Sequence, residues 1–316
     1  MRALEPLTRR ACLGLGAGAF LASRTARASA TPGDFRNRLR GPILSVPTVY
    51  NASFDLDLDG FRKIVDTGIR AGCQAIALTA GNSQYDRLTY EEIKQLTRTL
   101  IRAVNGRGLT IAATGPWWTG QAVDYAHFAD SAGADALQVF VPQYGDEDML
   151  FHHFRQIADA TKLGIVLHGQ VSWPLLKRLV TIDSIVAYKE EYQPAYSVEL
   201  FAGYGNRLNI FAGGQKSRYL MFQPYGMKAY YSTFSTFAPE VPKRFWSACE
   251  KNDLEAARRV VVECDIPFFH AWSHPFWRAT LEFFGVAKRY VRPPDRSFTP
   301  EQVRQLKTLY APMGLA

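Results

Sequence analysis

The chain has 316 residues, of which 47% are hydrophobic and 21% are charged, a composition typical of a folded globular protein and not of a disordered one. Its net charge is +8, but half of this charge belongs to residues 1–30, which contain five arginines and one glutamate. The remaining charge forms no run of like residues, which argues against a nucleic-acid-binding protein.

The first thirty residues contain, in order, the three parts of a bacterial secretory signal. Arg9-Arg10 precedes an uncharged stretch over residues 11–22, and Ala28-Ser29-Ala30 supplies small residues for a cleavage site. The paired arginines and the mildly apolar, Gly-rich stretch favour the twin-arginine route. We therefore expect residues 1–30 to be a signal peptide and the mature protein to be periplasmic, without stable membrane insertion, because about twelve apolar residues are too few to span a bilayer. The alternative is a basic N-terminal segment with no targeting role.

From residue 41 onward, short apolar stretches alternate with stretches of helical periodicity. The predicted strands cover residues 43–49, 74–79, 109–114, 136–141, 164–168, 184–189, 208–212 and 227–231. The predicted helices between them cover residues 58–71, 90–104, 122–131, 148–160, 174–179, 196–204 and 217–222.

Eight strands alternating with helices predict an α/β fold, the closed parallel (β/α)8 or TIM barrel. From about Pro239 the chain is helical and rich in aromatic residues, so we expect a C-terminal helical extension that packs on the barrel. No Pro/Gly-rich linker divides the chain, so residues 31–316 are expected to form a single domain.

Removal of residues 1–30 would leave three cysteines, and an odd number argues against a complete disulfide framework. Cys73 lies beside a predicted buried strand and is expected in the core. Cys249 and Cys264 fall in helical patterns, and the sequence leaves open whether they form a bridge.

Lys189 ends the apolar stretch Ser184-Ile185-Val186-Ala187-Tyr188-Lys189. A lysine ammonium is costly to bury, so burial favours the neutral amine. A neutral amine is a nucleophile that can attack a ketone and form an imine. The carboxyl end of a barrel strand is the place where such chemistry occurs, although a lysine leaving a surface strand could equally be a solvated side chain.

Six segments stand in the order in which one known family has its motifs. They are Thr79-Ala80-Gly81-Asn82, Val141-Pro142-Gln143-Tyr144, Ala187-Tyr188-Lys189-Glu190, Ala212-Gly213-Gly214-Gln215, Phe237-Ala238-Pro239-Glu240 and Val291-Arg292-Pro293-Pro294. Through them the chain resembles the dihydrodipicolinate synthase / N-acetylneuraminate lyase family from about residue 41 to residue 309. The resemblance implies a (β/α)8 barrel in which a lysine, here Lys189, binds a 2-oxo acid as an imine, and it implies a homodimer or homotetramer.

The chain departs from this family at two places. In the family, two adjacent hydroxyl residues after the second strand hold the substrate carboxylate; Thr79 keeps the first, whereas Ala80 lacks the second and Asn82 replaces a glutamate. A tyrosine at the end of the fifth strand is replaced by His168, and no arginine matches the one that binds a second carboxylate in the synthases. These differences, together with the predicted export, argue against a role in lysine biosynthesis.

His168 is the candidate proton carrier, because imidazole titrates near the working pH, with a structural buried histidine as the alternative. Thr79 is expected to bind the substrate carboxylate or else to cap its loop. In the same loop Ala80, Gly81 and Asn82 are candidate substrate-binding residues, since Gly81 and Asn82 could offer backbone N–H groups to that carboxylate.

Two tyrosines complete the predicted site through the resemblance. Tyr144 matches a tyrosine that reaches the proton relay of a neighbouring subunit, unless it only packs, and Tyr231 matches an apolar position that lines the substrate pocket. No metal is predicted, because His152 and His153 are adjacent and point about 100° apart on a helix, and the chain contains neither an HExxH motif nor paired cysteines. No cofactor is expected.

The leading hypothesis for function is an exported class I aldolase-like lyase that forms a lysine imine with a 2-oxo acid, of the pyruvate type or a keto-deoxy sugar acid, and cleaves or forms a C–C bond. The second is a dehydratase for a keto-deoxy sugar acid. The third is a non-catalytic periplasmic binding barrel, suggested by Ala80 and His168 at positions where the family has hydroxyl groups. In each case the expected partner is a small 2-oxo acid.

Overall fold

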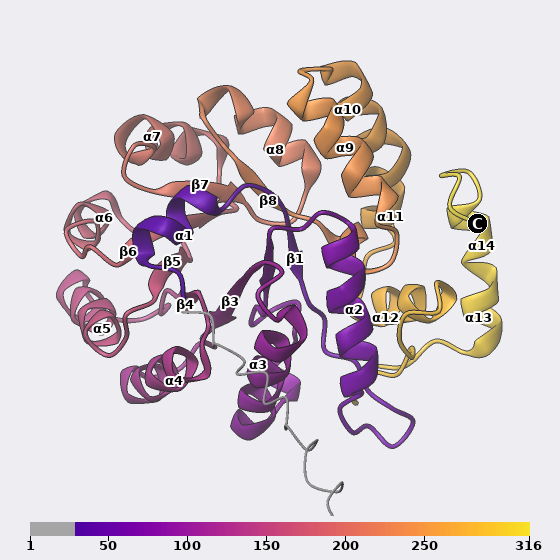
Figure 1. The fold of residues 1–316 in the computed structure, drawn as a ribbon, viewed down its shortest axis with the longest axis horizontal. Coiled ribbons are helices and arrows are strands. Elements are labelled where there is room, and N and C mark those ends of the chain that lie inside the picture. Colours follow the sequence, from indigo (N-terminus) through magenta and orange to yellow (C-terminus); the bar gives the residue numbers. More distant parts are fainter. Residues whose placement is uncertain (1–28) are drawn as a thin grey trace, which may run out of the picture.

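The computed structural model describes residues 29–316 and contains a closed barrel of eight parallel strands that follow one another in chain order (Figure 1). The strands are β1 Gly41–Ser45, β2 Ala75–Ala77, β3 Leu109–Ala113, β4 Ala136–Phe140, β5 Gly164–His168, β6 Ile185–Glu190, β7 Asn209–Ala212 and β8 Ala229–Tyr231. Pairing of β8 with β1 closes the ring. The predicted TIM barrel is confirmed. The predicted signal peptide falls almost entirely on residues 1–28, which lie outside the described residues.

Helices surround the barrel, and a further set follows β8 (Figure 1). The helices up to β8 are α1 Pro32–Arg38, α2 Leu58–Arg70, α3 Tyr90–Val104, α4 Thr119–Ala132, α5 Glu147–Asp159, α6 Trp173–Leu179, α7 Pro194–Tyr204 and α8 Lys216–Phe222. The C-terminal extension contains α9 Glu240–Glu250, α10 Leu254–Val260, the π-helical turn η4 Val261–Asp265, α11 Ile266–His270, α12 His274–Phe283, α13 Pro300–Gln305 and α14 Lys307–Tyr310. The expected C-terminal helices are therefore present.

The first strand is shorter than predicted. Its ladder ends at Ser45, and the N–H of Val46 still bonds the carbonyl of Ala77. The next residue, Pro47, has no N–H to continue the pairing. The remaining residues of the predicted strand therefore form the start of the loop that leads to α2.

Helix α1, which the sequence analysis did not predict, closes the amino-terminal end of the barrel. Phe35 of α1 and Leu39 after it are fully buried and belong to the same apolar cluster as the inward-facing residues of the strands. Burial of one phenylalanine side chain contributes about 1.5–3 kcal/mol. With only one buried side chain in seven residues, this helix has no repeating apolar pattern that a sequence could reveal.

A second and larger apolar cluster fills the space between the strands and the helices and extends into the C-terminal region. Trp277, Phe268, Phe245 and Phe276 are buried there, so these aromatic residues pack as expected. The C-terminal extension is thus part of the same packed body as the barrel, and it lies beside α2 and α8 in Figure 1.

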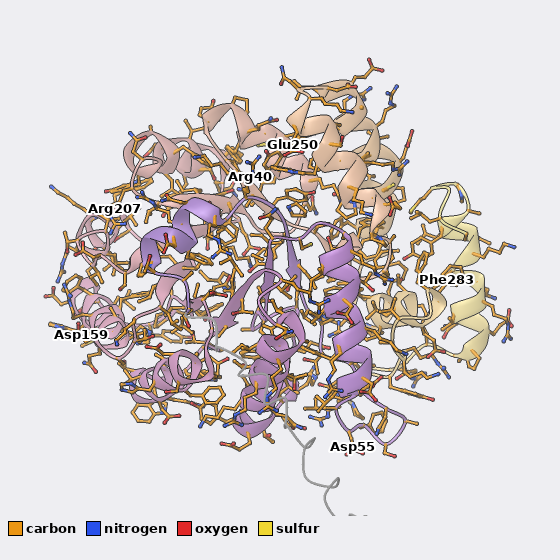
Figure 2. All side chains as sticks on the ribbon, in the orientation of Figure 1. Arg40, Asp55, Asp159, Arg207, Glu250 and Phe283 are labelled. Atoms are coloured by element: carbon orange, nitrogen blue, oxygen red, sulfur yellow. The ribbon has the colours of Figure 1, made fainter. Side chains whose placement is uncertain are left out.

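Polar contacts join segments that are far apart in the chain (Figure 2). Arg40, just before β1, pairs with Glu250 at the end of α9 at 3.2 Å. Both side chains are exposed, so this pair contributes at most about 1 kcal/mol. Arg207 donates to the carbonyl oxygens of Ile182 and Ile185. These bonds connect the segment before β7 with the start of β6.

The three cysteines after residue 28 are buried free thiols, so the possible bridge between Cys249 and Cys264 is not formed. Burial raises the pKa of Cys73 and of Cys249 to about 12, which keeps both thiols neutral. Within residues 29–316, no helix has both the length and the apolar character needed to cross a membrane.

Candidate active site

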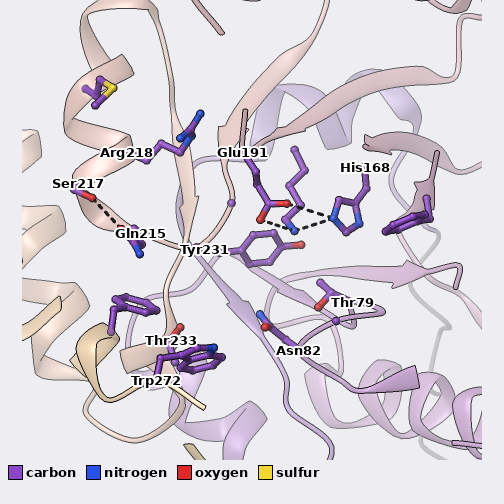
Figure 3. A pocket seen from close by; sticks show the side chains of 17 residues that line it. Thr79, Asn82, His168, Glu191, Gln215, Ser217, Arg218, Tyr231, Thr233 and Trp272 are labelled. Carbon is purple, nitrogen blue, oxygen red and sulfur yellow. Dashed lines mark hydrogen bonds and ion pairs between the residues drawn. The ribbon is translucent and has the colours of Figure 1, made fainter. Parts of the chain in front are cut away.

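His168 and Lys189 are neighbours because of an irregularity between β5 and β6. Ile165 pairs with Ile185, but a register shift follows, and His168 then pairs with Lys189. Bulges of this kind occur next to active sites, where they redirect side chains. As a result the Lys189 Nζ lies 3.0 Å from the His168 Nε2 (Figure 3). Lys189 is only 8% exposed, so the amine lies in a largely desolvated place.

Glu191, which was not predicted, completes a cluster with Lys189 and His168. Its carboxylate lies 2.9 Å from the Lys189 Nζ and 3.4 Å from the His168 Nε2 (Figure 3). Its neighbour Glu190 is fully buried, binds Arg218 and Ser197, and does not line the cavity. Side chains alternate between the two faces of a strand, so residues two apart share a face. If this alternation is extended one residue beyond the end of β6, Glu191 is expected to face inward with Lys189.

A glycine provides the room that Glu191 needs. A Cβ atom added to Gly213, after β7, would overlap the Glu191 side chain. Gly213 therefore allows the carboxylate to lie beside the amine, and this explains in physical terms why a residue without a side chain stands at the end of β7.

The charges of the cluster follow from its environment. Burial raises the pKa of Glu191, but the hydrogen bond from His168 and the charge of Lys189 outweigh it and lower this pKa to about 2. Burial and the charge of Lys189 lower the pKa of His168 below its usual value, against the effect of Glu191. At neutral pH, Glu191 is a carboxylate and His168 is an uncharged imidazole.

Gln138 of β4 links the cluster to Tyr231 of β8. The Gln138 Nε2 lies 3.2 Å from the His168 Nδ1, and the Tyr231 hydroxyl donates to the Gln138 Oε1 at 3.1 Å. With the amide in this orientation the uncharged ring carries its proton on Nε2, where the Glu191 carboxylate or an uncharged Lys189 amine can accept it. With the amide reversed, Nε2 accepts a proton from the Lys189 ammonium. From this second arrangement a proton can pass along the 3.0 Å contact from the Lys189 ammonium to the His168 Nε2, which leaves a free amine beside an imidazolium.

A cavity of about 800 Å³ lies at the carboxyl ends of the strands, and one of its walls contains Lys189, His168, Glu191 and Tyr231. Tyr231 lies beside the cluster, with the Lys189 Nζ 5.5 Å from its ring centre, and Figure 3 shows Thr79 and Asn82 on the other side of this ring. The rest of the cavity is lined by Phe140, Gly213, Gly214, Gln215, Ser217, Arg218, Met221, Thr233, Phe269 and Trp272.

The loop after β2 offers hydrogen-bond donors to the cavity. The Thr79 Oγ1 lies 3.1 Å from the Ser45 Oγ, which also accepts a hydrogen bond from the Asn82 side chain at 3.1 Å. Within residues 29–316, the backbone N–H groups of Ala80, Gly81 and Asn82 donate no hydrogen bond. Free N–H groups on successive residues of a turn can bind an anion.

Six of the eight predicted site residues line this one cavity: Lys189, His168, Thr79, Gly81, Asn82 and Tyr231. Ala80 does not line it and packs against the apolar core. Tyr144 is 87% exposed, also outside the cavity, and its suggested contact with a neighbouring subunit stays a prediction.

The rest of the cavity wall was not predicted. Arg218 of α8 binds the carboxylate of Glu190 with two nitrogens, at 2.6 and 2.5 Å. Phe269 and Trp272 reach the cavity from the C-terminal extension, so two of the aromatic residues expected only to pack also line the site. No local sequence pattern distinguishes them from their buried neighbours.

The two adjacent histidines of α5 take no part in the cavity. His153 is buried and its Nδ1 lies 3.0 Å from the Thr119 hydroxyl; burial lowers its pKa to about 4. In the part of the chain that the structure describes, no three His, Cys, Asp or Glu residues are grouped so that they could hold a metal ion.

Comparisons with known proteins identify the family and agree with the barrel fold. The sequence model of the dihydrodipicolinate synthetase family matches residues 38–311. A protein named "probable 5-dehydro-4-deoxyglucarate dehydratase 2" from Streptomyces avermitilis is 29% identical over 246 residues, which cover 73% of this chain and 74% of that protein.

Solved structures are similar over nearly their whole length. Dihydrodipicolinate synthase from Aquifex aeolicus has a TM-score of 0.79 and 21% identity, covering 88% of this chain and 99% of its own. N-acetylneuraminate lyase from Mycoplasma synoviae has a TM-score of 0.78 and 17% identity, covering 87% and 98%. At these identities the structures establish the fold.

The cluster predicts a measurable change in the titration of His168. Because the Glu191 carboxylate favours the imidazolium, the variant Glu191→Gln should have a lower pKa at His168 than the wild type. NMR titration of the histidine ring protons measures this pKa. His274, which lies outside the cluster and whose pKa burial lowers to about 4, serves as the internal reference. An unchanged or raised pKa at His168 would contradict the geometry of the cluster.

Proposed function

The chain belongs to the dihydrodipicolinate synthetase family, and we propose that it is a lyase that binds a 2-oxo acid as an imine on Lys189. The observation that carries this proposal is the desolvated amine of Lys189, within hydrogen-bond distance of an imidazole and a carboxylate in the wall of a cavity. A nucleophile with an adjacent base, and a third group that orients both, is the arrangement that covalent catalysis requires.

Imine formation begins with a proton transfer, in which His168 takes a proton from the Lys189 ammonium. The free amine then attacks C2 of the 2-oxo acid, and the imidazolium returns this proton to the C2 carbonyl oxygen. The resulting carbinolamine loses its hydroxyl group as water, with His168 again moving the proton. An ammonium and a ketone have then become a protonated imine and water, so the charge of the site is unchanged. Glu191 stays ionised throughout and stabilises the cation before and after the reaction.

The substrate carboxylate has its own binding place in this proposal. Thr79 offers a hydroxyl group, and Gly81 and Asn82 offer backbone N–H groups, on the same cavity as Lys189. A carboxylate held there directs the adjacent C2 carbonyl along the cavity wall. This division, with the carboxylate on the β2 loop and the ketone at β6, accounts for the six predicted residues that line the cavity.

The protonated imine withdraws electrons from C3, so the bond that breaks next decides the reaction. Loss of the C4 hydroxyl proton leads to cleavage of the C3–C4 bond and release of an aldehyde, which is the aldolase-like reaction. Loss of a C3 proton leads to departure of the C4 hydroxyl group as water, which is the dehydratase reaction. The second candidate is favoured by the relative from Streptomyces avermitilis, whose name is that of a dehydratase.

We further propose that the protein is exported by the twin-arginine route to the periplasm and that it forms a homodimer or homotetramer. The support for export is the order of paired arginines, apolar stretch and small residues in residues 1–30. Support for assembly comes from family membership and from the exposed Tyr144.

Trapping with borohydride tests the imine directly. Pyruvate and borohydride should add a covalent group to Lys189 in the wild type, located by peptide mass spectrometry, and none in Lys189→Met. His168→Gln should slow the trapping about a hundredfold or more, because it loses the proton carrier. Lys177→Met, which removes an exposed lysine of α6, is the matched control and should be trapped normally. A wild type that is never trapped by any 2-oxo acid would favour the non-catalytic binding barrel.

Product analysis separates the two reactions. Incubation with a panel of keto-deoxy sugar acids should give pyruvate and an aldehyde if the protein is an aldolase. The same incubation should give a product one water lighter than the substrate, and no pyruvate, if it is a dehydratase. Turnover by Lys189→Met in either assay would overturn the mechanism.

N-terminal sequencing of the protein from the periplasmic fraction tests export. The mature chain is expected to begin after Ala30, and replacement of Arg9-Arg10 by Lys-Lys should leave the protein in the cytoplasm. A protein that keeps its first thirty residues and stays in the cytoplasm would contradict the proposed localisation.

A further inference from the structure

Arg278 is a buried cation that takes no part in the reaction described above. It lies on α12 of the C-terminal extension and is 0% exposed. Its Nε donates to the carbonyl of Thr48 at 3.0 Å, and one terminal nitrogen donates to the carbonyl of Asn82 at 3.1 Å. The other terminal nitrogen lies 3.1 Å from the Nδ1 of His274. The guanidinium therefore reaches the loop after β2 from behind.

No carboxylate compensates this charge by direct contact. Among the described residues, no Asp or Glu oxygen lies within 4.0 Å of the Arg278 guanidinium, and its acceptors are two carbonyl oxygens and an imidazole. Asp295 is near enough to act on it electrostatically, but hydrogen-bonds Gln84 instead. His274 must be uncharged to accept from Arg278, which agrees with the lowering of its pKa to about 4 by burial.

A neutral amide could satisfy two carbonyl oxygens at a smaller desolvation cost than a guanidinium. By contrast Arg292 and Arg289, in the same region, each pair with a glutamate, Glu92 and Glu282 respectively. A buried positive charge with no carboxylate in direct contact attracts an anion placed nearby. The position of Arg278 directly behind Asn82 indicates where that anion would bind.

We propose that Arg278 is the positioning residue for the substrate carboxylate, acting through the Ala80–Asn82 backbone. This role rests on the proposed function. The charge of Arg278 would make the site select 2-oxo acids over uncharged ketones. Arg278 fixes the Asn82 carbonyl, so that the N–H groups of Gly81 and Asn82 stay directed to the carboxylate, and its positive charge favours an anion there. The C-terminal extension thereby takes part in substrate recognition without touching the substrate.

The experiment compares two ligands of similar size, pyruvate and the uncharged ketone hydroxyacetone, in reductive trapping on Lys189. Arg278→Gln should lower the trapping efficiency with pyruvate about ten- to a hundredfold, the range expected on loss of one charged partner. The same variant should change the efficiency with hydroxyacetone less than about twofold, which is under 0.5 kcal/mol. Arg278→Lys, which keeps the charge, should restore part of the preference for pyruvate.

His274→Glu provides a second variant that does not depend on the tolerance of the fold for loss of Arg278. It places a carboxylate beside the guanidinium, at the first residue of α12, where a negative charge is favourable. The internal carboxylate should compete with that of the substrate, so trapping with pyruvate should fall while the melting temperature stays equal or rises. Arg289→Gln, which removes an arginine already paired with Glu282, is the control and should keep the preference for pyruvate.

Two results would overturn the inference: equal losses with pyruvate and hydroxyacetone, which indicate a purely structural role, or an unchanged preference in both Arg278→Gln and His274→Glu. A wild type that traps neither ligand on Lys189 would instead overturn the proposed function. The two failures are therefore distinguishable in one set of measurements.

Discussion

The contact between the Lys189 amine and the His168 ring depends on a one-residue shift between two barrel strands. Along a strand, side chains alternate between the two faces, so a slip of one residue exchanges the inward and outward sets. The shift after Ile165 allows both strands to keep apolar residues in the interior and still end with Lys189 beside His168. Glu191, one residue past the strand, then reaches the same two groups, and Gly213 leaves the space that its carboxylate occupies.

Charge explains how one cavity can treat the two ends of a 2-oxo acid differently. At the ketone end, Lys189 and Glu191 compensate each other, and His168 is uncharged, so a proton can move without creating a new buried charge. At the carboxylate end, the β2 loop offers free N–H groups, and Arg278 stands behind it without a partner carboxylate. A ligand that carries both a ketone and a carboxylate satisfies both ends at once.

Much of the fold was predictable, because strands that are buried on both faces are nearly continuous apolar runs, separated by helical patterns. Lys189, His168 and Thr79 could be identified for the same reason: each ends such a run, and the carboxyl ends of the barrel strands meet at one face. Helix α1 was missed because a single buried side chain, Phe35, gives no periodicity. Helix α1 stabilises the fold by burying Phe35 at the end of the closed barrel, and this place exists only once the barrel has formed.

The site residues that were not predicted share one property, which is the absence of a local sequence pattern. Glu191 lies just beyond β6, and in the pair Glu190-Glu191 the sequence does not show which glutamate faces inward. Gln138 lies within β4, and the sequence does not show which group its amide contacts. Arg278 and Trp272 belong to the C-terminal extension, and their neighbours in space are far away in the chain, with Arg278 and Thr48 separated by 230 residues. Such contacts follow from tertiary packing and have no local pattern.

A crystal structure of the protein soaked with pyruvate would show whether Lys189 forms the imine. We expect continuous electron density from the Lys189 Nζ to C2 of the ligand, with Glu191 beside the imine nitrogen and the carboxylate on the N–H groups of Gly81 and Asn82. Pyruvate bound without a covalent bond to Lys189, or with its carboxylate directed away from the β2 loop, would contradict this expectation.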